Sequence, residues 1–198
     1  MNPTEIRENL DRTVARIRGL KNPSARAKQT MIARAYLEAR GALEALKEQE
    51  IASIGRQRQQ LDRKLFGTNG FSPDPNAVIA RRDANDRAAK LESPREAEQA
   101  LHRAEREGDR IMAKAIAARA ADFAGDPAWL YVLNTYVEGK PEETATLQAL
   151  VDLPDTDDGV WQLTKAMEYG IATPSELGDQ MPEGLAALPL DGDAPTAA

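Results

Sequence analysis

The most constraining feature of this sequence is a stretch, residues 24–66, that contains no proline and carries apolar residues at a fixed interval of eleven. The interval is marked by Ile32, Leu43, Ile54 and Leu65. Eleven residues make three turns of about 3.67 residues, so that one apolar stripe stays aligned along a nearly straight helix. At about 1.5 Å per residue, such a helix is roughly 65 Å long. The stretch therefore predicts one very long helix.

The preceding segment predicts a shorter helix that folds back over the long one. Its apolar residues lie on one helical face and are Ile6, Leu10, Val14 and Ile17. The short connection at residues 21–23 favours an antiparallel hairpin. The first helix reaches only the first half of its neighbour, so we expect the apolar residues near the other end to be exposed. The alternative is that this end packs on the chain's own C-terminal helices.

One short pattern occurs three times: a small polar residue, proline, any residue and glutamate, as NPTE (2–5), SPRE (93–96) and TPSE (173–176). Ser, Thr and Asn accept a free backbone N–H at a helix N-cap, and proline suits the first helical position. Glutamate at the third position reaches back to the cap. Each copy therefore predicts a helix start. A phosphorylation site is the weaker interpretation, because Asn2 begins an equivalent motif.

The rest of the chain predicts an all-α fold, because helix formers are abundant and no window alternates as a strand does. Residues 1–66 predict a basic helical arm, a hairpin that resembles a coiled coil. The turn-forming residues 67–76 predict a linker after it. Residues 77–170 predict an irregular bundle of short antiparallel helices. Residues 171–198 predict an acidic, largely disordered tail. The expected short helices are 77–91, 94–107, 110–124, 127–138, 141–152 and 159–169.

Charge is distributed unevenly along the chain. Residues 1–66 carry 14 Lys and Arg against 8 Asp and Glu, whereas residues 152–198 carry only Lys165 against 10 acids. A basic front and an acidic end suggest that the ends associate, or that a partner recognises one of them.

The residue types argue against an enzyme. The chain has no cysteine and a single histidine, His102, which excludes thiolate and multi-histidine metal sites. No Gly-rich phosphate loop, GxSxG or HExxH motif occurs, and we expect neither a cofactor nor a metal. The aromatic residues Trp129, Tyr131, Tyr136 and Trp161 could line a ligand pocket, but an ordinary core role is the more usual one.

The stretch IGRQRQQLDRKLF, residues 54–66, is the candidate binding segment. We hypothesise that it binds a protein partner or a second copy of the chain through apolar residues flanked by arginines. The alternative is a nucleic-acid-associated regulator, in which the arginines contact phosphates and the glutamines reach bases. The candidate residues are Ile54, Arg56, Arg58, Leu61, Arg63, Leu65 and Phe66.

The phrase LHRAEREGDRIMAKAIAARA, residues 101–120, resembles small accessory proteins from the structural gene clusters of actinobacterial phages and prophages. The long polar helix before it is similar in style to phage scaffolding or virion-assembly proteins. The resemblance implies a structural or assembly role without catalytic residues. No apolar run long enough for a membrane span and no secretory signal occur, so we expect an oligomeric protein in the cytoplasm, or in the host cytoplasm or virion if phage-encoded.

Overall fold

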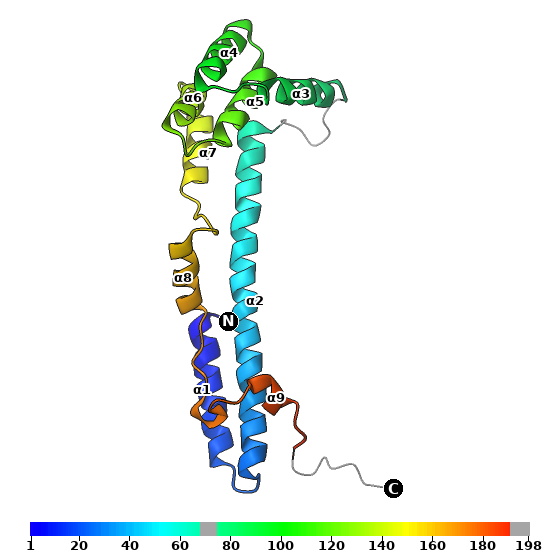
Figure 1. The fold of residues 1–198 in the computed structure, drawn as a ribbon, viewed down its shortest axis with the longest axis vertical. Coiled ribbons are helices and arrows are strands. Elements are labelled where there is room, and N and C mark those ends of the chain that lie inside the picture. The colour runs from blue at the N-terminus through cyan, green and yellow to red at the C-terminus, as the bar shows by residue number, and fades with distance from the viewer. Residues whose placement is uncertain (68–74, 191–198) are drawn as a thin grey trace. The chain divides into compact units, whose positions relative to one another are not determined.

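The computed structural model describes residues 1–67 and 75–190, and these ranges contain helices and connections but no strand (Figure 1). The predicted all-α class, with a long helix near the N-terminus and shorter helices after it, is confirmed. The chain divides into two compact units. Unit 1 combines Met1–Ser53 with Asp155–Ala198, and unit 2 is Ile54–Pro154.

Unit 1 is built on the predicted helical hairpin. Its first helix is α1 (Pro3–Gly19), and its second is the beginning of α2 (Ala25–Phe66). The first predicted helix start is confirmed, since the Glu5 N–H donates to Asn2 Oδ1 at 2.9 Å and the Asn2 N–H donates to the Glu5 carboxylate at 2.8 Å. These reciprocal bonds satisfy two backbone donors that a helix end otherwise leaves free.

The core of unit 1 follows the stripes predicted from the sequence. The four apolar residues of the α1 face are all buried, and they form one cluster with Ile32, Tyr36 and Leu43 of α2. Ile32 and Leu43 are each 1% exposed, which confirms that the eleven-residue interval marks a buried side of the long helix.

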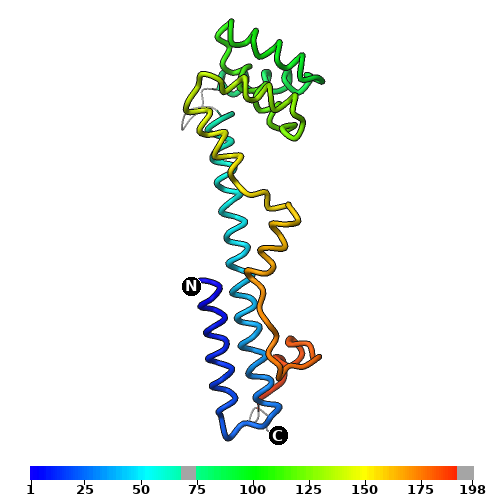
Figure 2. Tube along the Cα trace, turned by 90° about the vertical axis from the view of Figure 1, so that its left-hand side faces the viewer, coloured from blue at the N-terminus to red at the C-terminus, as the bar shows by residue number. Residues whose placement is uncertain are grey.

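The segment that follows residue 170 differs from the prediction of a disordered tail over 171–198. Residues 171–190 contain a 3-10 turn, η1 (Ser175–Leu177), and a short helix, α9 (Pro182–Ala186), while residues 191–198 lie outside the described part. Leu177 is 1% exposed and Leu185 is 6% exposed, and both join the hairpin core. Figure 2 shows this segment alongside the hairpin. The segment is ordered because two leucines enter a core that the hairpin alone leaves incomplete.

Charged groups reinforce this packing. Arg18 pairs with Glu176, and Arg40 pairs with Glu183. The Arg34 guanidinium donates to the carbonyls of Ala186 and Leu188, each at 2.9 Å. Within unit 1, the basic front of the sequence therefore meets part of its acidic end.

The third predicted helix start is wrong. Thr173 does not cap a helix, and its hydroxyl instead lies 3.4 Å from the Tyr36 hydroxyl. Pro174 precedes only the three-residue η1, which has no side-chain cap. The chain forms a short 3-10 turn here instead of a helix, and Leu177 at the end of that turn is buried in the unit 1 core.

Unit 2 contains the end of α2 and five helices: α3 (Pro75–Ala88), α4 (Pro94–Glu107), α5 (Arg110–Ala121), α6 (Pro127–Val137) and α7 (Pro141–Val151). Helix α5 is central, since it packs against α3, α4 and α6. Leu101 of α4 and Ile116 of α5 are both fully buried in the core that these helices share. The Ser93 cap accepts the Glu96 N–H at 3.3 Å, so the second predicted helix start is confirmed.

The boundaries of the two units differ from the predicted division. The compact units separate near residues 54 and 154 rather than at the linker predicted over 67–76, of which residues 68–74 lie outside the described part. The helix predicted at 159–169 is present as α8 (Gly159–Glu168), but it belongs to unit 1 and not to the bundle.

Candidate functional site

The apolar residues of the predicted binding segment 54–66 are turned into the protein. Leu65 is 1% exposed and Ile54 is 8% exposed, while Leu61 and Phe66 are half-buried. Leu65 is part of the unit 2 core, and Phe66 packs against it. The prediction that these four side chains form an exposed binding end is therefore wrong. The alternative, in which this end of α2 packs on the chain's own short helices, is correct for Leu65 and Phe66.

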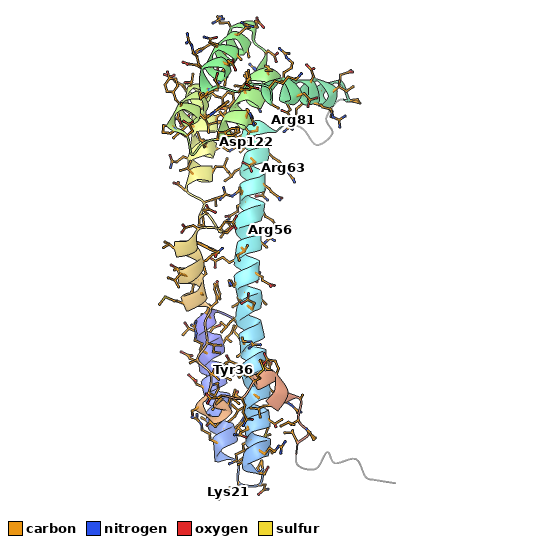
Figure 3. The ribbon with its side chains drawn as sticks, viewed as in Figure 1. Lys21, Tyr36, Arg56, Arg63, Arg81 and Asp122 are labelled. Carbon is orange, nitrogen blue, oxygen red and sulfur yellow. The ribbon has the colours of Figure 1, made fainter. Side chains whose placement is uncertain are left out.

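The polar residues of the same segment remain on the surface. Figure 3 labels Arg56 and Arg63 along α2. Arg58 donates to the Pro154 carbonyl at 3.2 Å. Partial burial raises the pKa of Asp62, which Arg58 lowers to a smaller extent. We call the exposed residues that share the side of the helix opposite Ile54 and Leu65 the α2 basic face: Arg56, Gln59, Gln60, Arg63 and Lys64.

A cavity of about 780 Å³ lies in unit 2, and its charged groups serve the fold. Lys140 Nζ lies 2.8 Å from Glu105 Oε1, and Lys114 Nζ donates to the Gly67 carbonyl at 3.2 Å. Asp109 caps α5. The lining that the structure describes contains no Ser, Thr, Cys or His, and the hydroxyl that it does contain is that of Tyr136.

The four aromatic residues considered as a pocket lining differ in burial and are divided between the two units. Trp129 and Tyr136 are 6% and 3% exposed in the unit 2 core, whereas Tyr131 is exposed and Trp161 belongs to unit 1. Burial, followed by nearby carboxylates, raises the pKa of Tyr136 to about 12. Trp129 and Tyr136 are thus core residues, as the ordinary interpretation predicted.

The single histidine lies on the surface of α4. His102 Nε2 is 3.8 Å from Glu98 Oε1, one helical turn away. Across residues 1–67 and 75–190 there is no group of His, Cys, Asp or Glu that could hold a metal ion. None of the helices in these ranges is both long enough and apolar enough to cross a membrane.

The most unusual surface of the described chain is on α8. Val160, Leu163 and Met167 are spaced by three and four residues, so they share one helical face. They are 74%, 64% and 76% exposed, and no residue of α8 is buried. We call these three residues the α8 face. Isolated exposed apolar residues are ordinary, but three on one stripe form a contiguous patch of the kind that marks an interaction site.

The other side of α8 is held to unit 1 by polar contacts. Lys165 Nζ lies 2.7 Å from a Glu50 oxygen and 2.8 Å from a Glu168 oxygen, and the Tyr169 hydroxyl donates to Glu50 at 2.8 Å. The Arg7 guanidinium donates to the Gly170 carbonyl at 3.0 Å and also to the Glu168 carbonyl. Arg7 thus satisfies carbonyls at the α8 C-terminus, where a positive charge is favoured.

The electrostatics of this attachment favour the charged forms. Hydrogen bonds to Glu168 and Glu50 raise the pKa of Lys165, which stays protonated. Partial burial acts to raise the pKa of Glu50, but the hydrogen bonds from Lys165 and Tyr169 and the Lys165 charge together lower it. Lys165 and, one turn before it, the half-buried Trp161 lie on the side of α8 that faces unit 1, whereas Val160, Leu163 and Met167 face away from it.

Sequence reasoning predicted the helix at 159–169 but did not predict an exposed apolar face on it. Val160, Leu163 and Met167 have the spacing of a buried face, and nothing in that spacing distinguishes a covered stripe from an uncovered one. Lys165, the one cation among the ten acids of residues 152–198, was a useful signal. It lies on the side of the helix away from Val160, Leu163 and Met167, and that side is the attached one.

Comparisons with known proteins add no relative. No protein-family description, no curated protein and no solved structure matches this chain.

Proposed function

We propose that this chain is a non-enzymatic protein–protein interaction protein and that the α8 face is its binding surface. The observation that carries the proposal is the orientation of α8, whose Lys165 side is bound to unit 1 while Val160, Leu163 and Met167 face away from it. Burying those side chains in a partner removes apolar area from water, which is the main favourable term in protein association.

The geometry suits a helical partner. The α8 face runs over two helical turns, about 10 Å at 1.5 Å per residue, and so matches the i, i+3, i+7 anchors by which amphipathic helices bind. The patch is small, and small interfaces belong to weak or transient encounters. The protein then acts as an adaptor that another chain engages through one helix. A role in virion assembly, to which the resemblance of residues 101–120 points, is one setting for such an adaptor.

A defined peptide tests this proposal. The probe is a fluorescently labelled, uncharged helical peptide with leucines at i, i+3, i+4 and i+7, and its binding is followed by anisotropy. We expect Leu163→Asp to weaken binding by at least about tenfold, as the loss of a central apolar anchor does. Val151→Asp is the matched control, because Val151 is equally exposed, at 66%, but lies in unit 2. Equal binding by both variants would contradict the proposal, and circular dichroism confirms that each folds.

The α2 basic face supports a second candidate function, nucleic-acid binding. Its arginines and lysine are exposed and could contact phosphates, and its glutamines are free of the core. Binding to a DNA duplex is expected to weaken steeply with salt, because each phosphate contact releases a counterion. Changing Arg56 and Arg63 together to Gln should then make the plot of the logarithm of the binding constant against the logarithm of the salt concentration less steep, by roughly 2. Binding that does not change between 50 and 200 mM salt, roughly the range over which such contacts are lost, would rule out this candidate.

A further inference from the structure

The α8 face is acidic at its N-terminal end. Asp155, Asp157 and Asp158 precede the helix and are exposed. At the other end Glu168 is paired with Lys165, and the Arg7 guanidinium contacts the Gly170 and Glu168 carbonyls, so the charges there are balanced. An apolar stripe with carboxylates at its N-terminal end therefore faces any partner.

From this surface we infer that the partner of the α8 face is a basic amphipathic helix of another protein, apolar along one stripe and rich in Lys and Arg at the end that meets Asp155, Asp157 and Asp158. This inference rests on the proposed function and names the chemistry of its partner. Complementary charge around a small apolar contact increases the association rate and excludes partners of the wrong sign. A helix that is acidic at this end would meet the three aspartates and be repelled.

A second copy of α8 does not fit this surface. In a parallel pair, Asp157 and Asp158 meet their own equivalents, which costs free energy as the contact excludes water. In an antiparallel pair centred on Leu163, Asp157 of each copy meets the C-terminal end of the other helix. There Lys165 and Arg7 are already engaged by Glu50, Glu168 and backbone carbonyls, so they supply no free cation.

The remaining basic surfaces of the chain do not supply the partner helix. The α2 basic face has the required charge, but Ile54 and Leu65 on that helix are buried. Val78 and Ile79 of α3 are exposed beside arginines, yet adjacent residues on a helix point in different directions. The residues one turn further along α3 are Arg81, Arg82 and Asp83, so no apolar stripe continues from them.

The inference is tested with three peptides that share the same leucine stripe and carry lysines, glutamates or neither at their ends. Binding to the full chain is measured by anisotropy at low and moderate salt. We expect the basic peptide to bind about tenfold more tightly than the neutral one at low salt, since a few rim ion pairs contribute that much together. Asp155→Asn with Asp157→Asn is expected to remove most of this advantage, while the shape of the side chains is kept.

A variant separates apolar docking from general attraction of a cation to an acidic protein. Leu163→Asp adds a negative charge, so simple charge attraction would strengthen binding of the basic peptide, whereas apolar docking predicts that binding is lost. Val151→Asp again serves as the matched control. A strengthened complex with Leu163→Asp would overturn the inference.

The outcomes distinguish this inference from the proposed function. Equal binding of the three peptides, lost in Leu163→Asp, overturns the basic partner and leaves the binding surface in place. Failure of all three peptides to bind overturns both. Light scattering of the full chain gives the last outcome: a dimer that Leu163→Asp converts to a monomer overturns the basic partner in favour of a second copy.

Discussion

Helices α4 and α8 carry the same kind of apolar stripe and use it in opposite ways. In α4 the stripe residues, at intervals of four and three, are fully buried, whereas in α8 the stripe residues, at intervals of three and four, are all exposed. The α4 set is Ala97, Leu101 and Ala104, at 0%, 0% and 3% exposed, and the α8 set is Val160, Leu163 and Met167. Spacing therefore determines whether a helix has an apolar face, and tertiary structure determines whether that face is covered.

The difference arises from the neighbours of each helix. Helix α4 packs against α5 and α6, and its stripe shares the unit 2 core with Ile116 of α5 and Val132 of α6. Helix α8 is attached through Lys165, on its polar side. Substitutions on the two stripes should therefore have opposite consequences, one for stability and the other for binding.

The largest expected effect is on the stability of unit 2. Leu101→Ala removes a fully buried side chain from a tightly surrounded site and should lower the free energy of unfolding by about 4 kcal/mol. The chain has two tryptophans, one in each unit, so urea unfolding followed by Trp129 fluorescence in a Trp161→Phe background reports on unit 2. The equivalent change on α8, Leu163→Ala, should fall within about 0.5 kcal/mol of the parent, as surface substitutions do. This variant is followed by Trp161 fluorescence in a Trp129→Phe background, which reports on unit 1. Similar losses for the two variants would remove the contrast between the stripes.

The next effect concerns unit 1 and the segment 171–190. Leu177→Ala removes a buried side chain, but this short segment can shift to fill the void, so we expect about 2 kcal/mol, at the lower end of the usual range. Hydrogen exchange of the amides in α1 and the start of α2 measures this loss of stability in unit 1, because these helices share a core with Leu177. Unchanged protection of both helices would show that the leucine adds nothing to that core.

A smaller effect is expected where α8 is attached. Glu50→Gln removes the charge that Lys165 contacts, and because both groups are partly exposed the loss should be less than about 1 kcal/mol. The readout is faster amide exchange in α8, with exchange in α4 unchanged. Glu44→Gln, at a carboxylate 3.5 Å from Lys47 on the same helix, is a control that should leave α8 unaffected.

The same ion pair gives α8 a pH dependence. The pKa of Glu50 is lowered in the folded protein, so its contribution to stability is complete above the ordinary glutamate value of 4.5 and is lost as the pH falls through the lowered value. Exchange in α8 should therefore be constant from neutral pH to about pH 5, after correction for intrinsic rates, and accelerate below that. In Glu50→Gln the acceleration should be reduced. An equal acceleration in that variant would assign the pH dependence to other carboxylates.

The smallest effect is expected for a truncation after Leu188. This change keeps Leu177, Leu185 and an oxygen of Leu188 that can accept from Arg34, which are among the contacts that bind the segment to the hairpin. The melting temperature should shift by less than about 2 °C. Truncation after Ala172, which also removes Leu177 and Leu185, is the comparison and should shift it by several degrees. A large shift for the shorter truncation would place further stabilising contacts beyond residue 188.

Local patterns predicted the helices well, because their signals lie within a few residues. The cap at Asn2 and the end of α4 at Gly108, with φ of 71°, are examples. Burial depended on distant residues and was harder to predict. The interval from Ile32 to Leu65 identified a buried side of α2, but the cover over Leu65 comes from helices that no pattern in α2 specifies.

The same limit explains the errors at the C-terminal end and on α8. Leu177 and Leu185 are isolated in an acidic segment, and their burial depends on a hairpin more than 130 residues earlier in the chain. The binding surface was predicted on α2 because basic residues and apolar residues occur together there. The structure separates them, since Leu65 turns inward and the arginines outward, and the exposed stripe lies instead on α8.

The discontinuous composition of unit 1 has a consequence for synthesis on the ribosome. Unit 2 is one continuous stretch, whereas the core of unit 1 contains both Ile6 and Leu185. At about 5–20 residues per second, the interval between the two parts of this core is on the order of ten seconds. During that interval the nascent hairpin presents the apolar surface that Leu177 and Leu185 later cover. Unit 2 can therefore complete its core first, and the N-terminal hairpin is the part of the nascent chain most in need of protection by a chaperone.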